Sequence, residues 1–260
     1  MPESVCHSCG LEAVGQYCQH CGQKQHTHRL TWAYLLSDIQ QGLFGFDNKY
    51  FRTIRDLTIR PGKVVRSIIG GVRVKYMGPI GYYFIMLTIY LLLMSFLDID
   101  FSVFTKSVVS EADTEFERKF QESIFSGIFS NFRVTSFLMA PFFILGVWLL
   151  FKKKKYNFLE TSVLYFYGQG HTMILSIIAI FVYYFSNEFN YITYMLPFSI
   201  TYFGYVCASF YPGNAFWNFV KSILGLLLGY VIMMFLFLIG LLTYIFSNPD
   251  IIEQFKQGGN

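Results

Sequence analysis

Charged residues are scarce in this sequence, and several long stretches contain almost none. Only 14% of the 260 residues are Asp, Glu, Lys or Arg, whereas an ordinary globular protein has about 25%. Hydrophobic residues make up 54% of the chain and aromatic residues 20%. One core of this size would not bury so many aromatic side chains. The composition therefore excludes an ordinary soluble domain and indicates helices that face lipid.

Recognisable catalytic motifs are also missing. The chain has no H-E-x-x-H, no P-loop and no G-x-S-x-G sequence, each of which would place reactive groups at a defined spacing. Its apolar stretches contain no Asp, which excludes an intramembrane aspartyl protease. The N-terminus lacks the basic start and short apolar core of a secretory signal peptide, so we expect it to lie in the cytoplasm. The sequence favours a non-enzymatic role.

Five stretches are long and apolar enough to form membrane helices, because a hydrocarbon core of about 30 Å requires about 20 residues. The predicted spans are 80–97, 134–151, 161–185, 191–211 and 222–246. We expect an all-α integral membrane protein with a membrane domain over 80–246. An outside loop over 98–133 and an outside tail over 247–260 complete this part of the chain.

The distribution of positive charge predicts the orientation of these helices. If the N-terminus is inside, the inside segments hold fifteen of the twenty Lys and Arg residues, and the outside segments hold ten of the sixteen acidic residues. The run Lys152–Lys155 directly follows the second predicted span. The pattern predicts a cytoplasmic N-terminus and a C-terminus on the other side of the membrane.

Cysteine is nearly confined to the first 21 residues, where four of the five cysteines lie. Their spacing is C-x2-C-x8-C-x2-C, and a glycine follows each pair; the residues are Cys6, Cys9, Cys18 and Cys21. In a reducing compartment such pairs more often hold a metal than form disulfides. Four thiolates leave no open position, which is typical of structural zinc. We predict a zinc ribbon over 1–28, with a rubredoxin-like iron site or a redox dithiol pair as alternatives.

Residues 29–79 are predicted to form a basic, amphipathic segment at the cytoplasmic membrane surface. Within it, Phe51, Ile54 and Thr58 form one helical stripe, and Pro61-Gly62 ends that helix. Candidate contacts to anionic headgroups are Arg52, Arg55, Arg60, Lys63, Arg66, Arg73 and Lys75. Ordinary anchoring by positive charge is the alternative. We expect no nucleic-acid partner, because the charges alternate with apolar residues.

A resemblance to a known family involves these same segments. The cysteine pairs ending in "CGQK", followed by "FRTIRDLTIRPGKVVRSIIGGVRVKYMGPI", resemble a bacterial domain-of-unknown-function family common in Bacteroidota. Its members have a small zinc ribbon, a T-I-x-x-L-x-x-x-P-G-K block and several membrane helices. The resemblance covers roughly residues 6–85. It implies a bacterial cytoplasmic membrane protein and brings no activity with it.

Polar groups inside the predicted spans are few. His171 and Gln169 lie in "YGQGHTM" and are the candidates for a membrane polar site, since such groups are costly in lipid. A hydrogen-bonded packing histidine is the alternative. In the fifth span, Gly225 and Gly229 form a G-x-x-x-G motif, which permits close helix packing within the chain or in a homodimer.

These features favour an adaptor or scaffold that recruits a protein partner through its zinc ribbon. A small transporter or channel-like protein is an alternative that requires a polar face shared by several residues. Those residues are His171, Gln169, Thr88, Ser199 and Thr201. A lipid-modifying enzyme is a second alternative and requires His171 at headgroup depth beside the basic segment.

Overall fold

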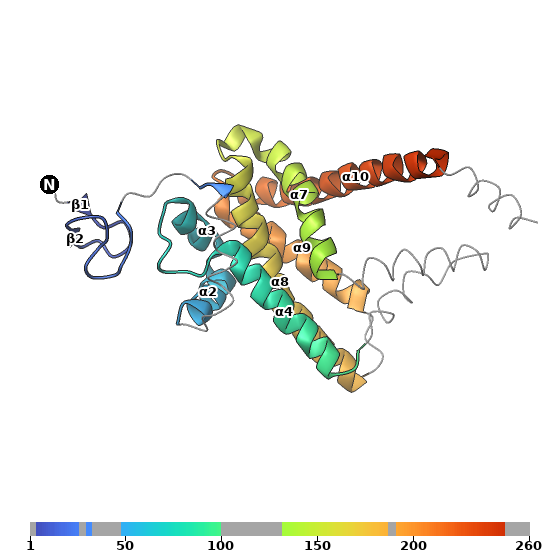
Figure 1. Ribbon diagram of the computed structural model, residues 1–260, viewed down its shortest axis with the longest axis horizontal. Helices are drawn as coiled ribbons and strands as arrows, with labels where there is room; N and C mark the ends of the chain where they lie inside the picture. The colour runs from blue at the N-terminus through green and yellow to red at the C-terminus, as the bar shows by residue number, and fades with distance from the viewer. Residues whose placement is uncertain (1–3, 26–29, 33–47, 100–131, 187–190, 248–260) are drawn as a thin grey trace, which may run out of the picture.

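The computed structural model describes residues 4–25, 30–32, 48–99, 132–186 and 191–247. In these residues a short two-stranded ribbon precedes a set of helices (Figure 1). Most of the predicted outside loop, the outside tail and the segment 33–47 lie outside the described residues.

The N-terminal ribbon is built from two short strands and two tight turns. Strand β1 (Ser4–Val5) pairs antiparallel with β2 (Glu12–Ala13), and Tyr17 forms an isolated bridge with Lys24. Its buried apolar residues are Cys6, Ala13 and Cys18. Because so small a core cannot offset the entropy of ordering the chain, the ribbon depends on a cross-link through its cysteines.

Among the described residues, four helices are long and apolar enough to cross a membrane, which indicates a membrane protein. They are α4 (Pro79–Phe96), α7 (Phe132–Phe151), α8 (Phe158–Ser186) and α10 (Ala215–Ser247). The predicted span over 191–211 is also a helix, α9 (Tyr191–Phe210), whose described apolar part, Met195–Phe210, is shorter. All five predicted spans are therefore helices, and four of them meet the length and composition expected of a membrane span.

Helix α8 is the centre of the bundle. In an 18-residue apolar window of its Phe158–Phe185 span 67% of the residues are buried, against 11% in such a window of the Ala215–Gly240 part of α10. Its glycines permit close neighbours, because a Cβ on Gly170 would lie 3.1 Å from the Cα of Tyr83 in α4. We infer that α8 carries the contacts that hold the other helices together, whereas α10 exposes most of its apolar surface.

The G-x-x-x-G motif packs α10 against α7 within the chain. A Cβ on Gly146 of α7 would lie 2.2 Å from the carbonyl oxygen of Gly225 and 2.4 Å from the nitrogen of Gly229. A real Cβ cannot lie so close to backbone atoms, so only glycine at position 146 allows the two helices to pack this closely. The glycine face of α10 is therefore occupied by α7 and is not a free surface for a second copy.

Two short helices cover one end of the bundle. Helix α2 (Asn48–Ile59) and helix α3 (Pro61–Ile69) pack against α8 and α9. The face of α2 that packs inward contains Tyr50, Thr53 and Leu57, whereas Phe51 of the predicted stripe is 66% exposed. Both helices thus belong to the folded body, and η1 (Lys152–Lys154) lies between α7 and α8. We call this end of the bundle the basic end; its exposed basic residues include Arg52, Arg60 and Lys63, and it also contains the run Lys152–Lys155.

Candidate functional site

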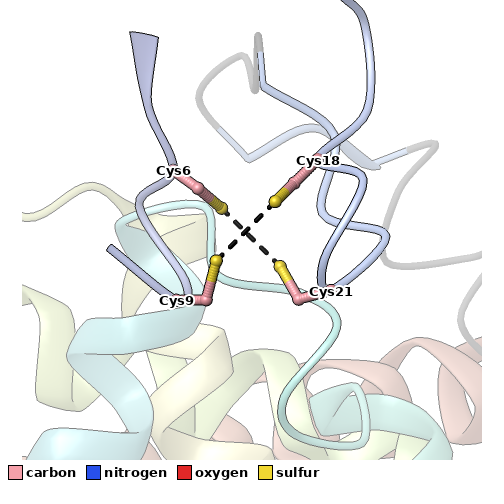
Figure 2. Close-up of side chains that lie close together, drawn as sticks. All are labelled: Cys6, Cys9, Cys18 and Cys21. Carbon is pink, nitrogen blue, oxygen red and sulfur yellow. Dashed lines mark hydrogen bonds between the residues drawn. The ribbon is translucent and has the colours of Figure 1, made fainter. Parts of the chain in front are cut away.

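The four N-terminal cysteines form one compact cluster. The Sγ atoms of Cys6 and Cys21 are 3.6 Å apart, as are those of Cys9 and Cys18, and all four lie within 4.8 Å of one another. Figure 2 shows the four side chains pointing toward a common centre. Four sulfurs at 2.3 Å from a tetrahedral zinc ion would be about 3.8 Å apart. The geometry therefore fits a metal ion with four thiolate ligands.

Each cysteine pair lies on the same kind of turn. The Gly10 nitrogen donates to the Cys6 carbonyl at 2.9 Å, and the Gly22 nitrogen donates to the Cys18 carbonyl at the same distance. Gly10 and Gly22 have φ angles of +78° and +71°. A left-handed residue therefore follows each pair, and glycine adopts this conformation without a Cβ penalty.

The turn also prepares the sulfur for metal binding. The backbone N–H of Cys9 lowers the pKa of the Cys6 thiol to about 6, outweighing burial, and Ser8 and Gln25 contribute further hydrogen bonds. A thiolate is the form that binds metal. The turn thus favours the ligand form at Cys6 but not at Cys9 or Cys21. Despite a hydrogen bond from the Leu11 N–H, burial and the neighbouring thiols raise the pKa of Cys9 to about 12, and burial raises the pKa of Cys21.

In the part of the chain that the structure describes, the buried side chain of Gln23 joins the ribbon to the helical body. Its Nε2 donates to the Gly71 carbonyl at 2.8 Å, and its Oε1 accepts from the backbone nitrogens of Arg73 at 3.0 Å and Val74 at 3.4 Å. Gln23 is 2% exposed, and its own carbonyl accepts from the nitrogen of Cys18. We call these contacts between Gln23 and 71–74 the Gln23 latch. It connects the second cysteine turn directly to the segment between α3 and α4.

The inward face of α2 is polar, and its polar groups are paired. The Thr53 hydroxyl accepts from the Met77 nitrogen at 3.0 Å, and the Tyr76 hydroxyl donates to Asp56 at 2.9 Å. Burial raises the pKa of Asp56, but hydrogen bonds from Tyr76 and Arg55, with the charges of Arg55 and Arg60, lower it overall. Burial and the contact with Asp56 raise the pKa of Tyr76 to about 12. At neutral pH the Asp56 carboxylate is therefore charged and the Tyr76 hydroxyl is neutral. Their hydrogen bond holds α2 against the segment that leads into α4.

The start of α3 is fixed against the end of α9. A Cβ on Gly62 would lie 2.2 Å from the Ser209 carbonyl oxygen, and the Gly62 nitrogen donates to the Ser209 hydroxyl at 3.0 Å. Arg66 donates to the carbonyls of Ser209 and Phe210 at 2.7 and 2.9 Å. The P-G-K part of the block therefore requires its glycine for close helix contact.

The predicted headgroup contacts fall into two groups. Arg52, Arg60 and Lys63 are exposed at the basic end. The other four contact the protein. Arg55 pairs with Asp56 at 3.0 Å, and the Arg66 guanidinium donates to carbonyls of α9. The backbone nitrogen of Arg73 donates to Gln23, and the Lys75 Nζ lies 5.5 Å from the centre of the Tyr76 ring. The run Lys152–Lys155 lies at the same end, where Lys154 donates to the Pro212 carbonyl at 2.7 Å.

His171 is buried between three helices, with both ring nitrogens in hydrogen bonds. Nδ1 is 2.9 Å from the Tyr82 hydroxyl and Nε2 is 3.0 Å from the Thr58 hydroxyl. Thr58 can donate to the Ile54 carbonyl at 3.0 Å, and Tyr82 is fully buried. The arrangement that satisfies every group has Tyr82 donating to Nδ1 and Nε2–H donating to Thr58. His171 then has no free nitrogen and acts as a neutral link between α2, α4 and α8.

Gln169 does not share this environment. It lies with Ser199 along a cavity of about 500 Å³ between α7, α8, α9 and α10. Thr201 is exposed and Thr88 is half-buried. The five residues of the predicted polar face therefore do not share one surface: His171 bridges three helices, Gln169 and Ser199 line the cavity, and the two threonines lie elsewhere. His171 and Gln169 lie in one helix but contact different groups of residues.

Comparison with known proteins identifies one family. Residues 47–91 match the model of a family described as "Protein of unknown function (DUF3667)". This segment contains α2, α3 and most of α4. No curated protein and no solved structure matches the chain. The match and the cysteine cluster fit the resemblance to a family with an N-terminal pair of C-x-x-C motifs.

Sequence reasoning missed the roles of Gln23, Asp56 and Tyr82. Gln23 is the glutamine of "CGQK", and its position directly after the last cysteine and its glycine was the available signal. Asp56 is an acidic residue within a basic block, which is a signal for a buried partner. No local signal connects Tyr82 to His171, because the two residues lie in different helices.

Proposed function

We propose that this chain is a multi-pass protein of the bacterial cytoplasmic membrane that acts as an adaptor. The zinc-stabilised ribbon binds a protein partner, and the helical body anchors the complex. Both the N-terminus and the basic end face the cytoplasm, and the C-terminus is outside. The four-cysteine cluster supports a docking role over catalysis, because four thiolates leave no coordination position for a substrate.

One observation carries this proposal: the ribbon exposes large apolar side chains while it is held in place by the Gln23 latch. Val5, Leu11, Val14 and Tyr17 are 63%, 48%, 52% and 56% exposed. Four large exposed apolar side chains on a module of this size supply the apolar surface that a protein–protein contact uses. The latch restricts the movement of this surface, which lowers the entropic cost of binding.

The test is in-cell crosslinking followed by purification of the tagged protein and identification of its partners. A Val14→Ser/Tyr17→Ser variant removes apolar surface and keeps the cysteines, whereas a Cys6→Ser/Cys9→Ser variant removes the metal site. Gln19→Ser changes an exposed ribbon residue and is the matched control. We expect the same partner with the wild type and the control, and its loss from both other variants. Recovery of identical proteins from all four would refute the adaptor role.

The metal itself is tested by elemental analysis of the purified protein. We expect one zinc per chain in the wild type and none after Cys6→Ser/Cys9→Ser. Iron in place of zinc would replace the zinc assignment with the rubredoxin-like alternative.

The basic end is proposed to bind anionic headgroups. Support comes from the exposed side chains of Arg52, Arg60 and Lys63, which lie at the same end as Lys152–Lys155. Polybasic surface at a membrane contributes about 1 kcal/mol per charge. We expect retained phosphatidylglycerol in native mass spectra of the wild type and less in an Arg52→Gln/Arg60→Gln/Lys63→Gln variant. Equal retention would contradict specific headgroup binding.

A further inference from the structure

We propose that the cavity between α7, α8, α9 and α10 binds a neutral lipid: an uncharged, membrane-dissolved molecule with an apolar chain and a carbonyl or hydroxyl oxygen. We call it the bundle cavity. Its volume is about 500 Å³, and Phe143, Gln169, Ser199 and Tyr230 are among the residues that line it.

Four polar groups line the bundle cavity without protein partners. They are the Gln169 amide and the hydroxyls of Tyr165, Ser199 and Tyr230. Among the residues that the structure describes, none of the four has a hydrogen-bond partner. In a membrane, a polar group without a partner costs several kcal/mol. Four such groups along one cavity indicate that a bound molecule supplies the missing hydrogen bonds.

The rest of the bundle shows that this is unusual for the chain. His171, Tyr82 and Thr172 all have hydrogen-bond partners in the described residues. Tyr202 and Tyr205 donate to the carbonyls of Leu57 and Ile59 at 3.1 and 2.9 Å. Elsewhere in the described part of the bundle the buried Tyr211 hydroxyl also lacks a partner, but it does not line this cavity, whereas the cavity brings four such groups together.

The walls of the bundle cavity define what the ligand is. The remaining lining residues are apolar, and among the described residues no Lys, Arg, Asp or Glu lines the cavity. A charged phosphate would have no counter-charge there, which disfavours a phospholipid head. An amide and three hydroxyls instead suit a carbonyl or hydroxyl oxygen, and the apolar walls suit a hydrocarbon chain.

The cavity is accessible from the surface that faces lipid. Leu196, Leu227 and Tyr230 line it and are 58%, 56% and 49% exposed. A second, smaller cavity of about 170 Å³ shares Phe143, Tyr165 and Gln169 with it. A ligand can therefore enter from the bilayer, place its oxygen at Gln169 and extend its chain along the groove.

The experiment measures binding of two neutral probes to the full chain in phosphatidylcholine nanodiscs, by native mass spectrometry. Decylubiquinone carries carbonyl oxygens and dioctanoylglycerol carries ester and hydroxyl oxygens, so the pair distinguishes a quinone from a glyceride. The nanodisc supplies phospholipid with a zwitterionic phosphocholine headgroup in large excess. Saturable binding of either probe would then show that the site prefers an uncharged molecule.

Variants of residues that line the bundle cavity test whether the probes bind there. Gln169→Leu/Ser199→Ala removes two polar groups and is expected to weaken probe binding about tenfold or more, as the loss of one or two hydrogen bonds implies. Ser199→Phe fills the cavity and keeps the proposal testable should the double variant misfold. Thr201→Val removes an exposed hydroxyl from the same helix and is the control. The proposal is overturned if neither probe saturates, or if the cavity variants bind as well as the control.

Discussion

At the scale of single residues, this protein buries several polar side chains that have defined partners on other segments. Asp56, Thr53 and His171 are 3%, 0% and 5% exposed, and all three bind groups on other segments. A buried polar group stabilises a fold only while its hydrogen bonds are complete. Even a substitution that changes only a few atoms at these positions should therefore lower the stability of the fold, because it leaves a buried polar partner without its hydrogen bond.

Asp56 should make stability depend on pH. Its pKa is lowered in the folded state, so its contribution is complete above the unfolded value of about 4 and is lost as pH falls through the folded value. We expect Asp56→Asn to lower the free energy of unfolding by about 1–3 kcal/mol at neutral pH. Thermal unfolding in detergent from pH 7 to pH 3 measures both effects. The wild type should lose more stability toward low pH than Asp56→Asn, and parallel curves would contradict the assignment.

The link between His171 and Tyr82 predicts energetic coupling. His171→Leu leaves the buried Tyr82 hydroxyl without an acceptor and should cost about 1–3 kcal/mol. A double-mutant cycle with Tyr82→Phe measures this coupling. The losses of unfolding free energy in the two single variants should sum to clearly more than the loss in the double variant, because Tyr82→Phe removes the hydroxyl that His171→Leu leaves unpaired. Unfolding in detergent measures all four forms. Strictly additive losses would show that the contact contributes nothing.

At the scale of elements, close packing of small residues decides how the helices meet. Gly62 allows α3 to touch α9, Gly170 allows α4 to approach α8, and Gly146 allows α7 to contact α10. In lipid the hydrophobic effect does not drive helices together, so close backbone contact has greater weight.

Gly146→Ala should separate α7 from α10. The added methyl would meet backbone atoms of Gly225 and Gly229, which cannot rotate away, so we expect a loss of about 1–3 kcal/mol or more. Gly240→Ala is the control in α10, because nothing lies within 4 Å of its Cβ position. Resistance to thermal unfolding in detergent separates the two. If Gly146→Ala is as stable as the control, the α7–α10 packing described above is wrong.

At the scale of the whole molecule, two parts with different sources of stability meet, among the described residues, at the Gln23 side chain. The ribbon depends on its cysteine cluster, whereas the helices depend on length, apolarity and packing. The Gln23 latch is the buried contact through which the state of the metal site reaches the bundle.

Removing the metal should therefore release the latch and leave the helices intact. After chelation we expect faster hydrogen exchange in residues 4–25 and also in 71–74, with unchanged helical circular dichroism. Gln23→Ala should raise exchange in 71–74 without loss of metal, which separates the latch from the metal site. If chelation leaves exchange in 71–74 unchanged, the ribbon and the body are independent.

Local patterns were sufficient for part of this description. The C-x2-C spacing with a following glycine predicts the four ligands, because two cysteines and their turn lie within a few residues. Runs of about 20 apolar residues predict the membrane helices, since each helix satisfies its own backbone hydrogen bonds. The charge of the segments between runs predicts which end is basic. Each of these features is contained within one short segment of chain.

The remaining features depend on segments that are distant in the sequence. Gln23 meets 71–74, Thr58 meets His171, and Gly146 meets Gly225. No periodicity within α2 indicates that Thr53 and Asp56 face inward, because the polar partners that make this favourable are in 76–77. Likewise Gln169 and Ser199 line one cavity only because α8 and α9 lie side by side. Contacts of this kind follow from the packing of whole helices, which local residue patterns do not specify.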